Sequence, residues 1–284
     1  MAISNSTTLA SLLPEIVAEA IFQANEQSLM RSLVRNFNIP AGSGNTIKVP
    51  VYPTFEAVSA NEATAFGGAG DAQVNTGSVQ LTTGEVGMTT TVSDIAMIGS
   101  ASNVVADIGG QFGRGIAEKI DADLCALFAA LNSGTTIGDG TTAITAAKIF
   151  EAIAKLKTAK VPSSNIYCVL HPEVAYDLKA NLTNTFANPN DGLSTEVMRN
   201  SFVGTLGGVP VYESAAIVST AGDSVGAVFH RDALGLAMMK DITIETQRES
   251  TLRADTITAS AVYGVGELID TYGIGLNFDS SINP

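Results

Sequence analysis

The stretch that decides the fold is VVADIGGQFGRGIAEKIDADLCALFAAL, residues 104–131. Its large apolar residues recur every four positions, at Val104, Ile108, Phe112, Ile116, Ile120, Leu124 and Phe128. This spacing places them on one face of an α-helix. We predict one long helix over residues 102–131, about 45 Å long at 1.5 Å per residue. Its core-facing side chains are predicted to be Ile108, Phe112, Ile116, Ile120 and Leu124.

Glycines at positions 109, 110, 113 and 115 are unusual inside such a helix. Each one costs up to about 1 kcal/mol relative to alanine. Two interpretations stay open. The glycines mark a bend or the close approach of another backbone, or the helix breaks near Gly109.

Two segments of different character precede this helix. Residues 8–38 carry apolar residues at helical spacing and predict an N-terminal helical arm. Residues 46–92 contain two alternating apolar and polar runs around a tip rich in Gly, Ala and Asn, which predicts an extended β-hairpin. A two-stranded ribbon is only marginally stable by itself. We therefore expect the hairpin to lie against its own body or a neighbouring chain.

The segments after the helix mix both kinds of structure. A second helix is predicted from about Thr145, its N-cap, to Lys160. NIYCVLHPEVAYDLKAN, residues 165–181, predicts a strand that leads into a helix. Short strands are predicted at 225–229, 235–239 and 242–247, and a long apolar strand region with glycines at 255–278.

The composition points to burial against partners. Charged residues make up 15% of the 284 residues, against roughly 25% in an average soluble domain. No stretch approaches the ~18 apolar residues of a membrane span. The formal net charge of −13 disfavours direct nucleic-acid binding, which needs Lys and Arg to replace counterions. A net negative charge would suit a surface that lies beside nucleic acid without binding it tightly.

The cluster of Cys168, His171 and Glu173 suggests an enzyme at first sight. In a strand, however, Cys168 and His171 point to opposite faces, whereas a thiolate–imidazole pair needs a contact of about 3 Å. Pro172 and Glu173 suit the first turn of a helix. We therefore predict a core strand and a helix start at this position, and no catalytic residue.

Other chemical signatures do not occur in the sequence. It has no phosphate-binding loop, nucleophile elbow, His-Glu-x-x-His or Cys-x-x-Cys motif. With only His171 and His230, a histidine-based metal site is not expected. The start, MAISNSTTLA, lacks the features of a signal peptide, so we expect cytosolic synthesis and two reduced cysteines. The predictions are therefore no enzymatic activity, no cofactor and no metal.

Taken in order, these elements resemble the major capsid proteins of tailed phages with the HK97-like fold, an α+β fold. That family has an N-terminal arm, a long hairpin called the E-loop, a spine helix, an axial domain, and strands that return to a peripheral domain. LGGVPVYES and FHRDALGLAMMKDITIETQRES are also similar to strands of that family. The resemblance implies five parts: an arm (1–44), an E-loop (45–93), a spine helix (94–132), an axial domain (133–255) and returning peripheral strands (256–284).

The resemblance implies a function as well. Copies of the chain would assemble through pentamers and hexamers into an icosahedral virion shell, built in the host cytoplasm around double-stranded DNA that it does not read. Portal and scaffold or decoration proteins would be its partners. The implied inter-subunit contacts lie in the E-loop: Lys48, Glu56, Glu62, Phe66 and Asp71. Lys48 is the only lysine in 45–92, so we do not expect the covalent crosslink that some members form from an E-loop lysine.

Three alternatives remain. An encapsulin, the shell of a cellular compartment that loads enzyme cargo, shares the same fold and most of these features. An enzyme that uses Cys168 or His171 is the alternative from another class. A secreted β-rich adhesin is disfavoured because the sequence shows no signal peptide.

Overall fold

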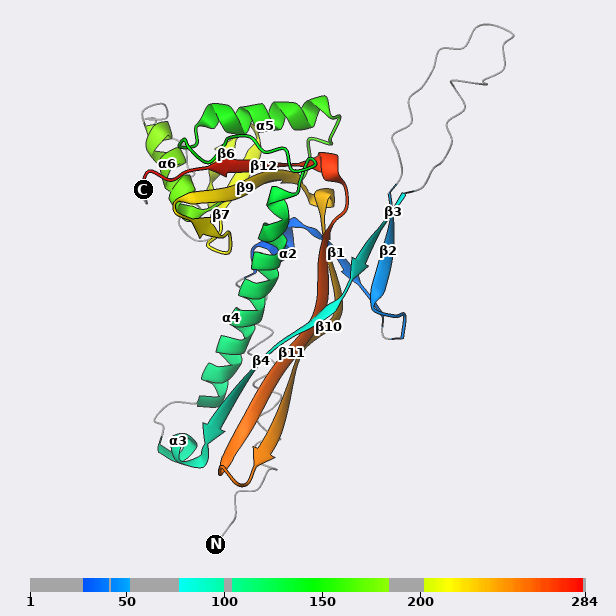
Figure 1. Cartoon of the computed structure of the whole chain (residues 1–284), viewed down its shortest axis with the longest axis vertical. Coiled ribbons are helices and arrows are strands. Elements are labelled where there is room, and N and C mark those ends of the chain that lie inside the picture. Colours follow the sequence, from blue (N-terminus) through cyan, green and yellow to red (C-terminus); the bar gives the residue numbers. More distant parts are fainter. Residues whose placement is uncertain (1–27, 41, 52–76, 100–103, 184–201, 283–284) are drawn as a thin grey trace, which may run out of the picture.

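The computed structural model describes residues 28–40, 42–51, 77–99, 104–183 and 202–282. It is an elongated α+β molecule in which one long helix connects two β-sheets (Figure 1). The predicted arm, except for its last residues, and residues 52–76 of the predicted hairpin lie outside the described residues. No helix of the described part is long and apolar enough to cross a membrane.

The long helix is α4, Val104–Cys125, followed by a 3-10 turn, η2, Ala126–Ala129. It runs through Gly109 and Gly110 without a break, so the interpretation of a broken helix is wrong. The predicted α-helical end at residue 131 is also wrong, because the last turn tightens into η2. A Cβ at Gly115 would meet the flexible end of the Met88 side chain and no backbone atom, so the expected close approach of another backbone is not found at this glycine.

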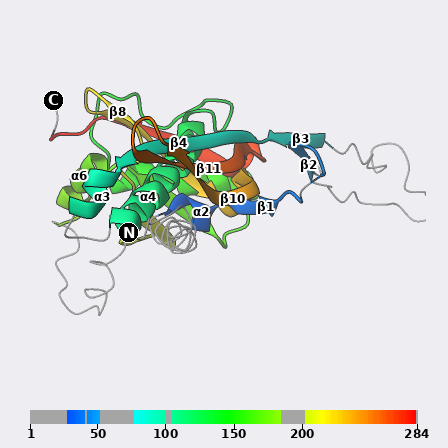
Figure 2. The same cartoon turned by 90° about the horizontal axis from the view of Figure 1, so that it is seen from below.

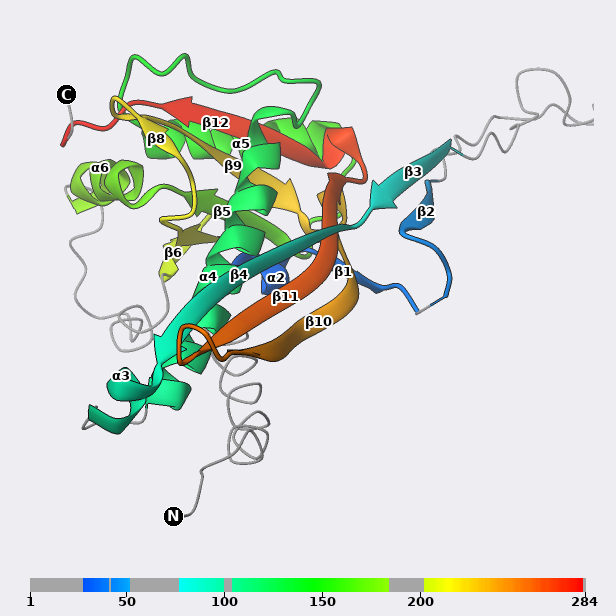
Figure 3. The same cartoon turned by 60° about the horizontal axis from the view of Figure 1, so that its bottom comes forward.

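One face of α4 packs on a four-stranded sheet of order β1-β10-β11-β4. In Figure 3 the strands β4, β11 and β10 lie side by side along the helix. Only β1 is parallel to its neighbour. The strands are β1 Arg35–Asn38, β4 Gly84–Ser93, β10 Leu234–Glu249 and β11 Ala254–Glu267. Two short helices border this layer, α2 Met30–Leu33 and α3 Asp94–Gly99.

The end of α4 and η2 pack on a six-stranded sheet of order β12-β9-β5-β7-β6, with β8 beside β9. The rings of Phe128 and Phe229 lie 5.5 Å apart across this contact. The other face is covered by the helices α5 Ala146–Thr158 and α6 Pro172–Thr183. The strands are β5 Ile166–Leu170, β6 Phe202–Leu206, β7 Val209–Glu213, β8 Ser219–Thr220, β9 Asp223–His230 and β12 Gly273–Phe278.

The quoted strand–helix segment forms β5 and α6. Cys168 lies in the core beneath α5 and α6, whereas Tyr167 and Val169 face the core that contains the end of α4. The predicted alternation of faces is therefore confirmed. It separates Cys168 from His171, which follows the strand.

The predicted hairpin over residues 46–92 is shorter than expected. Strands β2, Thr46–Val51, and β3, Gly77–Thr82, form an antiparallel two-stranded ribbon. After Thr83 the chain becomes β4 and joins β11 in the four-stranded sheet. In Figures 1 and 2 the ribbon points away from both sheets.

Strand pairing also crosses the expected boundary at residue 255. The strands predicted at 235–239 and 242–247 are one strand, β10, with register irregularities between Met238 and Thr243. It pairs with β11, whereas β12 leaves β11 to pair with β9 in the other sheet. The long region at 255–278 is thus divided between the two sheets.

Candidate assembly surfaces

The base of the β2–β3 ribbon is fixed to the body by a small apolar cluster. The side chains of Val49 and Leu81 are buried there against Ile39, Ala237 and Leu268. The backbone N–H of Thr83 donates to the carbonyl of Asn45 at 2.9 Å and closes the ribbon at this end.

Two glycines of β11 let the ribbon approach the sheet. A Cβ at Gly264 would collide with the backbone of Thr82, and one at Gly266 with the side chain of Leu81. Gly264 is therefore required by the close approach of a neighbouring backbone, whereas a side chain at Gly266 would displace the end of the Leu81 side chain.

Of the predicted E-loop contact residues, Lys48 lies on the ribbon with its side chain exposed, opposite Gln80. The other four, Glu56, Glu62, Phe66 and Asp71, lie outside the described residues. Their part in subunit contacts stays a prediction.

The predicted core face of α4 points into the larger of the two main apolar clusters. Phe112, Ile116, Ile120 and Leu124 are buried in it, and Ile108 is partly buried against it. These residues hold the helix against the four-stranded sheet. At the edge of this face, Nζ of Lys119 lies 2.7 Å from Oδ1 of Asp123, and the hydroxyl of Tyr263 in β11 donates to Asp123 at 2.8 Å.

The start of the described chain is held by Asp121, a buried carboxylate of α4. Its oxygens accept hydrogen bonds from the hydroxyl of Ser28 at 2.7 Å and from the backbone N–H groups of Leu29 and Met30 at 3.0 and 3.4 Å. Burial raises the pKa of Asp121, against the effect of these hydrogen bonds. The carboxylate thus fixes the place where the predicted arm meets the body. The sequence does not predict this role, because the carboxylate of Asp121 and its three hydrogen-bond donors lie about 90 residues apart in the chain and form no motif.

The far end of the four-stranded sheet, called the tip below, is held by a network of charged side chains. Arg248 of β10 donates two hydrogen bonds to the carboxylate of Asp94, at 2.6 and 2.7 Å, and a third to Asp255 at 3.1 Å. The bond from Arg248 holds the pKa of Asp94 below its ordinary value. Beside this network, Ile95 and Leu252 are 79% and 66% exposed. These two exposed apolar side chains make the tip a candidate contact surface.

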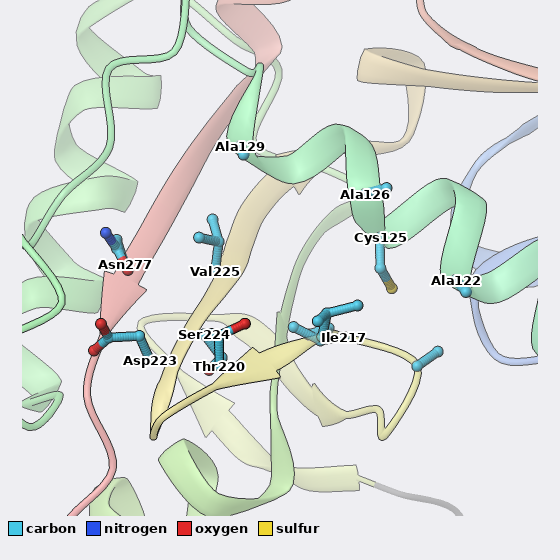
Figure 4. A pocket seen from close by; sticks show the side chains of 12 residues that line it. Ala122, Cys125, Ala126, Ala129, Ile217, Thr220, Asp223, Ser224, Val225 and Asn277 are labelled. Carbon is cyan, nitrogen blue, oxygen red and sulfur yellow. The ribbon is translucent and has the colours of Figure 1, made fainter.

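A pocket of about 400 Å³ lies where the end of α4 meets β8 and β9 (Figure 4). Ala122, Ala126 and Ala129 form one wall, with the thiol of Cys125 between them. Burial, and secondarily the charge of Asp121, raises the pKa of Cys125 to about 12. Because the thiolate is the reactive form of cysteine, this thiol is inert near neutral pH.

The Cys168 cluster is structural as well. Cys168 is fully buried, and burial raises the pKa of its thiol far above its ordinary value. Nδ1 of His171 accepts a hydrogen bond from the backbone N–H of Glu173 at 3.4 Å and lies 3.7 Å from the carboxylate of the same residue. His171 therefore caps the start of α6. His230 caps η3 in the same manner, accepting from the N–H of Asp232 at 3.1 Å.

Within the described ranges, no group of three His, Cys, Asp or Glu side chains is arranged to hold a metal ion. The ribbon, the start of the arm and the tip are the candidate assembly surfaces.

Comparison with solved structures shows the fold to be that of phage capsids. A structure from Mycobacterium phage Che8 is 21% identical, with 88% of this chain and 91% of that chain covered and a TM-score of 0.66. The capsid structure of cyanophage P-SCSP1u is 18% identical, with 89% of each chain covered and a TM-score of 0.67.

An encapsulin has a similar fold. The holo-SrpI encapsulin complex from Synechococcus elongatus PCC 7942 is 15% identical, with 90% of this chain and 89% of that chain covered and a TM-score of 0.65. At these identities the likenesses show the fold alone.

No curated protein sequence matches the chain at a significant level. A family profile does match. It is the profile of the family described as Phage capsid protein, and the match runs over residues 75–275, from the ribbon strand β3 to β12. The match spans well over half of the chain and both sheets, and the chain therefore belongs to the phage capsid protein family.

Proposed function

We propose that the chain is a major capsid protein of a tailed phage, which assembles through pentamers and hexamers into an icosahedral shell around double-stranded DNA. Membership of the phage capsid family is the observation that carries the proposal. The two thiols, whose pKa values are raised by burial, and the two histidines, which accept N–H hydrogen bonds at helix starts, have structural roles in this proposal.

The surfaces described above have distinct roles in this proposal. The ribbon reaches across a neighbouring subunit, and the segment before Ser28 lies against another. The tip with Ile95 and Leu252 meets other copies at the far end of the sheet. Closed shells arise when such surfaces repeat with rotational symmetry. The low charge content fits a subunit whose edges are covered in the assembly.

The domain division follows the sheets in this proposal. The six-stranded sheet with α5 and α6 is the axial domain, and the four-stranded sheet with α4 is the peripheral domain. This assignment moves β10 to the peripheral domain and β12 to the axial domain, relative to a simple boundary at residue 255. The ribbon is the base of the E-loop.

The net charge of −13 supports enclosure of DNA without tight binding. DNA is therefore cargo in this proposal, held by the closed shell. Portal and scaffold or decoration proteins complete the expected partners, and the mature location is the virion.

Electron microscopy of the purified chain, with its mass in solution, tests the proposal. Closed shells tens of nanometres across are expected, and a persistent monomer under all assembly conditions would overturn it. The content of shells from the natural host decides between the two shell functions. Nuclease-resistant DNA is expected, whereas a single packaged enzyme would identify an encapsulin.

A further inference from the structure

The pocket at the end of α4 has one wall made of small side chains. Ala122, Ala126 and Ala129 follow one another at helical spacing, and Ile217 and Val225 line the hollow from other elements. Ala126 and Ala129 are exposed. Pockets that enclose whole drug-sized ligands begin at about 300 Å³, so this hollow of about 400 Å³ has room for an aromatic side chain.

One polar group in the lining lacks a partner. Ser224 is only 3% exposed, and its hydroxyl has no hydrogen-bond partner within the part of the chain that the structure describes. Figure 4 shows this hydroxyl pointing toward Ile217, which also lines the pocket. Because a buried hydroxyl without a partner is unfavourable, the expected occupant is mainly apolar and carries one group that bonds to Ser224.

The rim of the pocket favours a protein as the source of this occupant. Val218 lines the pocket, and it is 76% exposed. A free small molecule inside the pocket would leave this side chain in water. A protein surface that inserts one side chain into the pocket would cover Val218 as well, and a filled pocket surrounded by covered apolar contacts is the usual arrangement at the centre of an interface.

The chain itself carries a side chain of matching chemistry. The exposed large apolar side chains of the described residues are Ile95, Phe150, Tyr176, Val218, Leu252 and Ile282. Only Tyr176 among them combines an apolar ring with a hydroxyl. It is 54% exposed on α6 and points away from the sheet, since Val174 and Leu178 are the side chains buried beneath this helix.

Tyr176 and the pocket lie on opposite faces of the six-stranded sheet. The helix α6 covers one face, and the end of α4, which forms the alanine wall, covers the other. The tyrosine therefore cannot fill the pocket of its own chain. A contact between two different surfaces of identical chains is heterologous, and such contacts generate closed rings when the rotation between copies suits them.

We propose that Tyr176 of one copy inserts into this pocket of the next copy, with its ring against the alanine wall and its hydroxyl bonded to Ser224. The inference rests on the proposed function and deepens it, because it names one contact that joins neighbouring copies within a pentamer or hexamer. Tyrosine suits such a role, since it is enriched among the residues that contribute most to protein interfaces.

The threshold concentration for assembly of the purified full-length chain, measured by light scattering, tests the contact. Each copy offers one tyrosine and one pocket, so the threshold changes by the factor for one contact. Tyr176→Ala should raise it at least about thirtyfold. Ala126→Gln fills the pocket from an exposed position of its wall and should act similarly. Phe150→Ala and Ala130→Gln, exposed and outside the pocket, are the matched controls and should leave it unchanged.

A double-mutant cycle tests the hydrogen bond within the contact. Tyr176→Phe and Ser224→Ala should each raise the threshold about three- to tenfold, and the double variant should do no more than either change alone, because both remove the same bond. Ser224→Ala should not lower the urea midpoint of the unassembled chain, since the hydroxyl has no partner there. A lower midpoint would assign Ser224 to the fold of the single chain and would contradict its role in the contact.

The outcomes separate this inference from the proposed function. If shells form and neither Tyr176→Ala nor Ala126→Gln changes the threshold, the contact is overturned and the capsid function stands. A persistent monomer of the unmodified chain would overturn both. If Ala126→Gln raises the threshold and Tyr176→Ala does not, another segment fills the pocket and the assignment to Tyr176 is wrong. In the unassembled Tyr176→Ala variant, p-cresol, the tyrosine side chain as a free molecule, should shift the methyl resonances of Ala122 and Ala129, and unshifted resonances would contradict the fit.

Discussion

The six-stranded sheet is stabilised by extensive burial within its own chain, whereas the β2–β3 ribbon buries little surface against the rest of the chain. Strands β9 and β12 are buried along most of their length, because α5 and α6 cover one face of the sheet and the end of α4 covers the other. The ribbon buries only Val49 and Leu81, at its base. The first region is stable through its own core, whereas the ribbon has little core of its own, as is expected if a neighbouring subunit covers it in the proposed shell.

The largest effect is expected in the doubly covered sheet. Phe229→Ala removes a fully buried ring that packs on Phe128, and should lower the free energy of unfolding by about 3–5 kcal/mol. Urea denaturation followed by circular dichroism measures it. Phe150→Ala, at a ring 46% exposed on α5, is the matched control and should cost much less. If the two substitutions lowered the free energy of unfolding by the same amount, the proposed difference in burial would be contradicted.

A smaller effect is expected where the arm joins α4. Asp121→Ala leaves the hydroxyl of Ser28 and two backbone N–H groups without their acceptor, at a cost of about 1–3 kcal/mol. The same denaturation experiment applies, with Glu118→Ala on the exposed side of α4 as control. An unchanged midpoint in Asp121→Ala would show that these bonds add no net stability.

The smallest effect on global stability is expected in the ribbon. Leu81→Ser removes an anchor of the ribbon, so the amides of β2 and β3 should lose protection from hydrogen exchange while those of β5 and β9 keep theirs. Lys48→Ser, exposed on the same ribbon, should leave both unchanged. If Leu81→Ser unfolded the six-stranded sheet as well, the two regions would form one cooperative unit.

The sequence was most informative where a pattern is local. The four-residue spacing of α4 and the face alternation of β5 are both present in the structure, because they depend on residues close together in the chain. The hairpin over residues 46–92 was predicted too long for the opposite reason. Alternation continues through Thr83, and only pairing with β11, more than 160 residues later, shows that β4 belongs to another sheet.

The same limit applies to the surfaces. Asp121 and the tip around Arg248 have no sequence signature, since their hydrogen-bond partners come from distant segments. The environment of His230 has no sequence signature either. Its side chain is buried and accepts from the N–H group of Asp232. Its burial depends on Tyr272, a distant residue whose ring edge packs on the imidazole.

The glycines beneath the ribbon have a mechanical consequence. At Gly264 and Gly266 the base of the ribbon lies directly against β11. β11 is the strand between β10 and β4 in the four-stranded sheet. In the proposed shell, a neighbouring subunit that contacts the ribbon would therefore exert its force on an inner strand of that sheet, and the ribbon and the sheet would move together.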